Sequence, residues 1–323
     1  MKFLFIATFL LCTMVGKAQL RQNVYLLKNN GEIVTTKDSA DFLRIIREPA
    51  KGEKLYDLLE YFTDGKQKLI GKTSKVEMVT LEGPCLTFFN SGQRKSIATY
   101  EHGHHINDLY EYYPSGKLHV VKHYPEKFKY DSSADTVTVI TDAYDSLGVA
   151  TVVNRKGYYT DYNEDFTEVA EQGPIENGKK SGEWKGADKK DTVTFKEKYN
   201  EGILIEGSAV KNGRNLTYSK ARYVPAGFPN GEKAFGMFLA RAIRYPAAAR
   251  ENNVQGMVVM QFFVEKDGTL TNIKVVNSVE KSLDDEALRA LKGSPKWTPA
   301  TKYGLPIRIY YTIPVQFALA VAR

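Results

Sequence analysis

The residues whose side chains could do chemistry gather first in a group of histidines. His102, His104, His105, His119 and His123 all fall within one short stretch. Imidazole clusters can bind zinc or copper, and His119 and His123 have the parity that puts two side chains on one face of a strand. No carboxylate or thiolate stands at a recognisable ligand spacing, and His102-Gly103-His104 also fits a turn. We therefore predict no metal site.

Two further motifs imitate ligand loops but lack essential residues. Asp161-x-Asn163-x-Asp165 begins like a calcium loop, yet Phe166 stands where the sharp turn needs glycine and Gln172 where a bidentate glutamate is needed. Gly65 to Thr73 resembles a phosphate loop with its glycines one residue too far apart. The sequence has no G-x-S-x-G motif and no supported Cys–His pairing. We expect no catalytic residue, no cofactor and no enzymatic activity.

The composition is that of a folded protein with a localised basic excess. The 323 residues are 42% hydrophobic, too apolar for a disordered chain, and the length suggests two domains. The net charge of +7 could indicate nucleic acid or anionic lipid. Residues 19–227, however, hold 30 basic and 30 acidic residues, whereas residues 228–323 hold 13 and 8. No nucleic-acid motif accompanies the basic part, so we expect no nucleic-acid partner.

The first residues have the pattern of an export signal. Lys2 precedes the apolar run Phe3–Gly16, and Gly16 and Ala18 provide small residues at a cleavage spacing. We predict a signal peptide over 1–18. The alternative is a retained anchor, but fourteen helical residues span only about 21 Å against a hydrocarbon core of about 30 Å. Cleavage removes Cys12 and leaves Cys85 as the single cysteine, so the mature chain forms no internal disulfide.

A repeated unit organises residues 19–227. Tyr61–Lys66 (YFTDGK) recurs as Phe88–Gln93 (FFNSGQ) and as Tyr112–Lys117 (YYPSGK), with weaker copies at Asn177–Trp184 and Tyr199–Gly202. Each unit has aromatic residues, a glycine turn and an alternating stretch, which predicts a β-hairpin. Repetition at this period predicts hairpins stacked into one long sheet or a β-solenoid. These units resemble MORN-variant repeats.

Other stretches of this region are also predicted from their patterns. Val24–Leu27 and Glu32–Thr35 suggest a first hairpin, Asp131–Thr141 and Ala150–Tyr159 suggest strands, and Asp38–Arg47 fits either strand or helix. The Pro/Gly-rich residues 224–231 read as a linker.

Residues 228–323 predict a small α+β domain. Phe235–Ile243 has helical periodicity, and Pro246 ends it and can begin a short helix through Ala249. Gly256–Val264 and Leu270–Val276 flank Asp267-Gly268 as a hairpin. A helix follows with Ser282 as N-cap, Asp285 as its capping-box partner and Gly293 at its end. The order is helix, hairpin, helix, strand.

The final strand has the features of a sheet edge. From Ile307 to Leu319, apolar residues alternate without a break with a second set of residues, and Pro314 occupies one position of that second set. Proline cannot donate to a ladder, so this strand should lie at an edge. The unpaired backbone groups of an edge can accept an added strand from a partner. The candidate edge is Ile307–Phe317.

An ordered set of motifs over residues 228–320 resembles the TonB C-terminal domain. It comprises Tyr245-Pro246, Gly256, Asp267-Gly268, Leu283–Leu288, Trp297-x-Pro299-Ala300, Gly304-x-Pro306 and Pro314-Val315-x-Phe317. The resemblance implies a periplasmic domain that docks on outer-membrane TonB-dependent receptors and captures their TonB box as an added strand. It implies partner-binding residues at Arg244, Tyr245, Pro246, Ile307, Arg308, Ile309, Tyr310, Tyr311, Thr312 and Ile313. Tyr245 and Trp297 fit equally well as core aromatics.

Three functions remain open at this point. The first is a periplasmic adaptor that binds outer-membrane TonB-dependent transporters, or a related envelope partner, by strand addition. The second is an inner-membrane-anchored energy transducer, coupled to proton-driven motor proteins, if residues 1–18 are retained; no proline-rich spacer supports it. The third is a structural envelope protein whose TonB-like domain self-associates as a homodimer.

Overall fold

The computed structural model describes residues 21–126 and 138–319. The predicted signal peptide 1–18 with Cys12, and most of the predicted strand Asp131–Thr141, lie outside these ranges. Within them, no helix combines the length and the apolar composition needed to cross a membrane.

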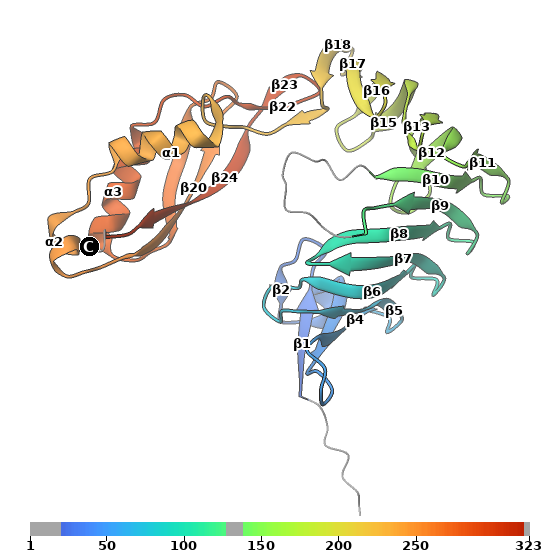
Figure 1. The fold of residues 1–323 in the computed structure, drawn as a ribbon, viewed down its shortest axis with the longest axis horizontal. Helices are drawn as coiled ribbons and strands as arrows, with labels where there is room; N and C mark the ends of the chain where they lie inside the picture. The colour runs from blue at the N-terminus through green and yellow to red at the C-terminus, as the bar shows by residue number, and fades with distance from the viewer. Residues whose placement is uncertain (1–20, 127–137, 320–323) are drawn as a thin grey trace, which may run out of the picture. The chain divides into compact units, whose positions relative to one another are not determined.

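The first part of the chain folds as one long antiparallel sheet of hairpins (Figure 1). Its strands are β1 Gln22–Leu27, β2 Ile33–Val34, β3 Phe42–Arg47, β4 Tyr56–Phe62, β5 Gln67–Thr73, β6 Leu81–Phe88, β7 Arg94–Glu101, β8 His104–Tyr112, β9 Leu118–His123, β10 Val139–Tyr144, β11 Ala150–Val153, β12 Lys156–Tyr162, β13 Val169–Glu176, β14 Lys179–Lys180, β15 Gly182–Asp188, β16 Val193–Asn200, β17 Ile203–Lys211 and β18 Arg214–Lys220. This arrangement confirms the predicted sheet of hairpins.

The three repeated motifs form the same turn. The backbone N–H groups of Phe62, Phe89 and Tyr113 each donate to the carbonyl four residues later at 2.8 Å. The third turn residue is Gly65, Gly92 or Gly116, with φ between 85° and 90°. Glycine adopts this left-handed conformation without the steric cost that other residues pay. The repeated glycine therefore marks a repeated turn, whereas the identity of the units as MORN-variant repeats stays a prediction.

Two predicted segments differ in the structure. Ala150–Tyr159 is not one strand, because Asn154 and Arg155 take φ of 49° and 70° and turn the chain between β11 and β12. Asp38–Arg47 is divided as well. It opens within a short 3₁₀ helix, Lys37–Ser39, and then continues as β3.

Glycines make room for large aromatic rings on neighbouring strands. A Cβ atom at Gly173 would lie 2.4 Å from the Trp184 ring, and one at Gly207 would lie 2.3 Å from the Tyr218 ring. Trp184 is buried and its indole N–H donates to the Pro174 carbonyl at 3.0 Å. Several repeats therefore depend on glycine for ring packing as well as for turns.

An ion network around the buried carboxyl of Glu197 links the last hairpins. The Arg222 Nε donates to Glu197 Oε1 at 2.6 Å, and Tyr218 donates to the same oxygen at 2.7 Å. Arg222 also pairs with Glu171, which pairs with Lys180. Burial by itself would raise the pKa of Glu197, but the hydrogen bonds from Arg222 and Tyr218 outweigh it and hold the carboxyl pKa below its usual value.

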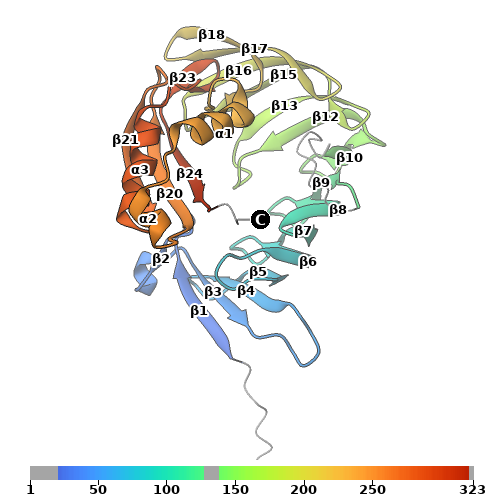
Figure 2. The same ribbon diagram turned by 60° about the vertical axis from the view of Figure 1, so that its left-hand side comes forward.

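The C-terminal region forms a three-stranded sheet in the order β21–β20–β24 with helices packed on one face (Figure 2). Its elements are α1 Gly231–Ala242, α2 Ala247–Glu251, β20 Gly256–Val264, β21 Leu270–Asn277, α3 Lys281–Lys292 and β24 Ile309–Phe317. Phe262 of β20 and Leu283 and Leu291 of α3 are fully buried in the shared core. The predicted order of helix, hairpin, helix and strand is confirmed.

The predicted linker is ordered. Tyr223–Val224 forms β19, which pairs with β22, Ala300–Lys302, and β22 pairs with β23, Leu305–Ile307. Gly227 forms a bridge with Thr298, and the Phe228 ring lies 5.9 Å from that of Trp297. These contacts tie the Pro/Gly-rich segment to the domain that follows it.

The N-terminus of α3 also differs from the prediction. Glu280 is the N-cap, and its carboxylate accepts from the backbone N–H of Ser282 at 2.9 Å. Ser282 therefore lies inside the helix, and Asp285 pairs with Lys281 instead of completing a capping box. Gly293 follows the helix with φ of −84°, which is not the left-handed conformation.

The chain forms two compact units. Of the described residues, one unit comprises 21–126, 138–168 and 175–179, and the other comprises 169–174 and 180–319. The second unit therefore contains β15–β18 together with the C-terminal region. These two units are groups of residues that contact one another, and they do not test where the predicted domains begin and end. The predicted limits, 19–227 and 228–323, stay a prediction.

Candidate partner-binding site

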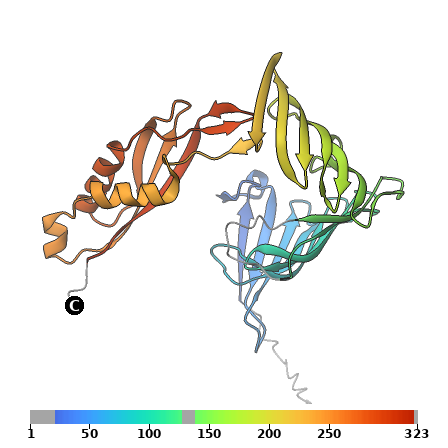
Figure 3. The same ribbon diagram turned by 45° about the horizontal axis from the view of Figure 1, so that its top comes forward.

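The strand β24 is an edge strand of the C-terminal sheet (Figure 3). Among the described residues it pairs with β20 alone, in a register that runs from Ile309 opposite Val264 to Phe317 opposite Gly256 without a shift. The other edge strand, β21, pairs with β20 through two register shifts, and its Asn272 has φ of 53°. Bulges disrupt an edge as a template for pairing. The regular edge available to a partner is therefore β24.

The side chains of β24 alternate between the core and solvent. Ile313, Val315 and Phe317 are buried, whereas Thr312 and Pro314 are exposed. Because Pro314 has no N–H and the register continues past it, its nitrogen should point away from β20. Backbone direction alternates with the side chains. We therefore expect the exposed residues of β24 to present their backbone groups at the free edge.

The predicted edge is interrupted at its start. Ile307 ends β23 and pairs with Ala300, so it belongs to the other small sheet. Arg308 lies between the two strands. Its Nε donates to Glu265 Oε1 at 2.8 Å, and its guanidinium carbon lies 3.5 Å from the centre of the Phe263 ring. The alternating pattern did not distinguish one long strand from two short ones, and Arg308 is held within its own domain.

Tyr310 stands at the start of the free edge and is 46% exposed. Its ring lies 5.0 Å from the Phe263 ring, and its hydroxyl is hydrogen bonded to Gln261. Phe263, Tyr310, Asn272 and Lys274 line an open depression on the face of the sheet that carries the exposed side chains of β24. A segment added at this edge would find an aromatic surface beside its first residues.

Tyr245 lies at the opposite end of β24. Its hydroxyl donates to the Val254 carbonyl, and its ring lies 5.8 Å from that of Phe317. Pro246 caps α2, and the Arg244 backbone N–H donates to Glu286. Tyr310 and Phe317 are seven residues apart, about 23 Å along a strand. The structure therefore places the two predicted groups at the two ends of one strand, with Tyr245 packed against the core.

Trp297 is a core residue. It is buried, and its ring lies 5.2 Å from Tyr311 and 5.4 Å from Phe262. It thereby packs against the core-facing side of β24. The interpretation of Trp297 as a core aromatic fits these contacts.

The turn between β22 and β23 contacts the last hairpins, and no feature of the sequence indicated this contact. Tyr303 is 4% exposed and packs between Phe195 and Tyr218 of the last hairpins. Lys302 Nζ lies 3.0 Å from Asp188 Oδ2 and also pairs with Asp191. A Tyr-Gly pair marks a turn, but nothing local in the sequence shows which surface receives the ring. This turn joins the C-terminal sheets to β15–β18.

The histidines and the calcium-loop-like motif, Asp161-x-Asn163-x-Asp165, contact different partners. His119 is buried and its Nε2 lies 2.9 Å from the Thr160 carbonyl, whereas His123 Nδ1 lies 2.7 Å from Asp108 Oδ1. His102 stands in the left-handed turn before β8. Asp161 accepts from the hydroxyl of Tyr159 at 3.1 Å. Within residues 21–126 and 138–319, no three His, Cys, Asp or Glu side chains come together as a metal site.

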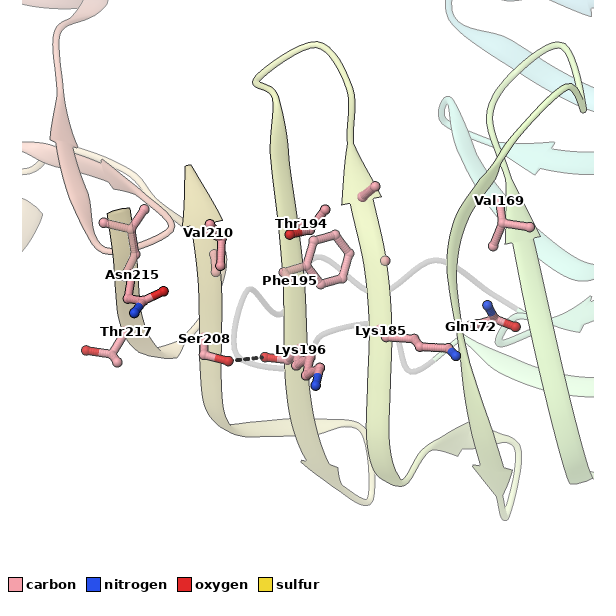
Figure 4. Close-up of a pocket in the computed structure, with 14 residues that line it drawn as sticks. Val169, Gln172, Lys185, Thr194, Phe195, Lys196, Ser208, Val210, Asn215 and Thr217 are labelled. Carbon is pink, nitrogen blue, oxygen red and sulfur yellow. Dashed lines mark hydrogen bonds between the residues drawn. The ribbon is translucent and has the colours of Figure 1, made fainter. Parts of the chain in front are cut away.

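A second concave surface lies on the exposed face of the last hairpins (Figure 4). Its volume is about 690 Å³, and it contains the directly opposed residues Gln172, Lys185, Lys196, Ser208 and Thr217. It contains none of the predicted partner-binding residues.

Comparison with known families gives a match over residues 241–319, to the family described as Gram-negative bacterial TonB protein C-terminal. No curated protein matches the chain. A solution structure of the Helicobacter pylori TonB C-terminal domain is similar at 26% identity, covering 29% of this chain and 89% of that one with a TM-score of 0.22. The TonB family is non-enzymatic, and the domain indicates the cell envelope. The family match confirms the resemblance found in the sequence: residues 241–319 are a TonB C-terminal domain.

Proposed function

We propose that this protein binds an outer-membrane TonB-dependent receptor by adding the receptor's extended TonB box segment to the free edge of β24. A TonB C-terminal domain implies a role in energy transduction or transport. The observation that carries the proposal is the one-sided pairing of β24, whose register with β20 has no shift. Strand addition uses unpaired backbone groups for affinity and alternate side chains for selectivity.

The electrostatic character of the domain is consistent with this role. Residues 228–323 carry the basic excess of the chain. Complementary charge speeds encounter with acidic segments more than it tightens the final complex. Arg308 is engaged by Glu265, so we assign it to holding the start of β24 and give the contact surface to Tyr310 and Thr312.

Periplasmic location after cleavage of residues 1–18 is part of the same proposal. The retained anchor is the alternative, and it would permit contact with proton-driven motor proteins. Determining the N-terminal residue of the mature protein distinguishes them. A start at Gln19 or Leu20 supports the adaptor, and a start at Met1 supports the anchored transducer.

Photo-crosslinking from β24 tests the binding role. A photoreactive phenylalanine at Thr312 should capture an outer-membrane TonB-dependent receptor in cells. The same group at Asn277, an exposed position of β21 outside the depression beside Tyr310, is the matched control and should capture much less. Capture of only a second copy from Thr312 would favour the structural envelope role and contradict receptor binding.

A further inference from the structure

One face of the first hairpins carries a continuous row of apolar side chains. Residues directly opposite each other on adjacent strands link eight strands, β1 and β3–β9. In order across the sheet they are Val24, Ile45, Leu59, Ile70, Leu86, Ile97, Tyr110 and Val121. Directly opposed side chains share one face of the sheet. None of the eight is buried, and Val24 and Ile70 are 53% and 40% exposed.

The buried core of these strands lies on the other face. Ile46 is paired with Leu58, and Cys85 with Ala98, and all four are 3% exposed or less. Each precedes or follows a member of the apolar row, so it points to the opposite side. The exposed row is therefore a second apolar face, and contiguous exposed apolar surface marks interaction sites.

A charged row runs beside the apolar one. Arg47, Asp57, Lys72 and Glu82 stand opposite each other in turn on β3, β4, β5 and β6. Their charges alternate across the four strands. Within the chain, Lys72 pairs with Glu53 and its Nζ lies 3.6 Å from Asp57 Oδ1, while Glu82 Oε1 lies 3.3 Å from His102 Nδ1. The side chains of Asp57 and Lys72 stay partly exposed.

We infer that this face is a homodimer interface, with the apolar row of one copy packed on the same row of a second copy. The charge order carries the argument. A two-fold axis parallel to the strands, between β4 and β5, reverses the order of the strands in the second copy. Asp57 then meets Lys72 of the second copy, and Arg47 meets its Glu82. A two-fold interface must be self-complementary in this way.

The same axis also matches the apolar row with itself. Leu59 meets Ile70 of the second copy, and Ile45 meets its Leu86. A two-fold axis along the charged row would instead place each charged residue against the same residue of the second copy. Like charges would then meet and repel each other. With this axis, six strands of each copy, β1 and β3–β7, face the second copy. At a spacing of about 4.8 Å between neighbouring strands, the contact is about 24 Å long. This length is at the small end of specific interfaces. The dimer should therefore depend on concentration.

Charge reversal tests the pairing of Arg47 with Glu82. These residues are three strands apart, about 14 Å, so they do not pair within one chain. Sedimentation of the purified protein should show that Arg47→Glu and Glu82→Arg each weaken the dimer about tenfold, since like charges then meet. An equimolar mixture should recover dimerisation, because every mixed contact is again between opposite charges. Lys185→Glu, on another part of the sheet, is the control and should leave the dimer unchanged.

Cysteine pairing gives an independent readout. Leu59→Cys and Ile70→Cys should each give little disulfide-linked dimer alone, whereas their mixture should give it readily. Cys85 should not interfere, because it is buried and burial raises the pKa of its thiol to about 11. A monomer at all concentrations, or a dimer that neither Arg47→Glu nor Glu82→Arg weakens, would overturn the inference. Melting curves of each variant show whether a loss of dimer reflects a loss of fold.

Discussion

Pro314 stands opposite Val259 in the middle of β24, and the pairing continues on both sides of it without a shift. A proline nitrogen directed at β20 would leave a gap in the ladder. Because the ladder accommodates Pro314 without a shift, its nitrogen faces away from β20. The exposed residues of β24 therefore direct their backbone groups to the free edge. This relationship links the sequence of the strand to its proposed use by a partner.

The glycines beneath aromatic rings should resist substitution. Gly207→Ala would place a Cβ atom 2.3 Å from the Tyr218 ring, and overpacking of this kind costs about 1–3 kcal/mol. Urea unfolding should show that loss. Gly236 of α1 has no atom near its missing Cβ, so Gly236→Ala should instead stabilise by about 0.5–1 kcal/mol. Equal effects of the two substitutions would contradict the packing argument.

The ion network around the buried Glu197 should make the second unit sensitive to acid. The pKa of Glu197 is lower in the folded protein than in the unfolded chain, so its contribution is complete above the unfolded value of about 4.5 and is lost as pH falls through the folded value. Glu197→Gln should cost about 3 kcal/mol at pH 7, because it leaves Arg222 with one carboxylate fewer. It should also reduce the loss of stability between pH 5 and pH 3.

The control for Glu197 is Glu183→Gln, which changes an exposed carboxyl of β15. It should leave both the stability and its pH dependence nearly unchanged. A similar acid response in wild type and Glu197→Gln would show that the network is not the cause.

His119 should stay neutral in the folded protein near neutral pH. Its ring is 2% exposed, its Nδ1 has no hydrogen-bond partner within the described residues, and Tyr113 and Tyr159 pack around it. Burial lowers its pKa despite the hydrogen bond to Thr160. Because the unfolded chain then binds a proton that the folded chain does not, stability should fall as pH drops below about 6.5.

Proton titration of the histidines by NMR measures this directly. The His119 signal should titrate at lower pH in the native protein than after unfolding. His119→Gln should remove the corresponding slope of stability against pH, while His104→Gln at an exposed position should retain it. A native His119 that titrates at or above 6.5 would contradict the assigned environment.

The turn at Tyr303 should hold the C-terminal sheets to the last hairpins. Tyr303→Ala removes a buried ring between Phe195 and Tyr218. This should lower the free energy of unfolding by about 3 kcal/mol. Limited proteolysis should then cleave residues 221–230 faster. Leu305→Ala, in the exposed part of the same hairpin, is the matched control and should leave the cleavage rate unchanged. Rapid cleavage of the wild-type protein at this segment would contradict an ordered connection.

Features set by neighbouring residues could be predicted from the sequence. The glycines at 65, 92 and 116 marked three turns that the structure confirms. Gly256–Val264 alternates so clearly that the predicted strand and β20 have the same bounds. The position of β24 at an edge followed from Pro314 alone.

Features set by distant residues could not be predicted in this way. Glu197 and Arg222 are brought together by the register of the last hairpins, and no spacing along the chain announces them. The ring of Tyr303 packs against Phe195 and Tyr218, which lie on strands far earlier in the sequence. Ile307 and Arg308 fit the alternation of the final strand, and only the pairing of Ile307 with Ala300 shows that the strand begins later. The cap of α3 moved to Glu280 because a glutamate side chain can also reach the first free N–H groups.

Proline substitution at Thr312 tests the central claim most directly. Thr312→Pro removes a backbone N–H that should face the free edge, whereas Thr312→Ala changes only the side chain. Binding is measured by calorimetry with the N-terminal segment of the receptor captured from Thr312, and near-UV circular dichroism reports the fold. We predict at least a tenfold loss of affinity for Thr312→Pro, little change for Thr312→Ala, and a native spectrum for both. Unchanged binding by a folded Thr312→Pro protein would contradict strand addition at β24.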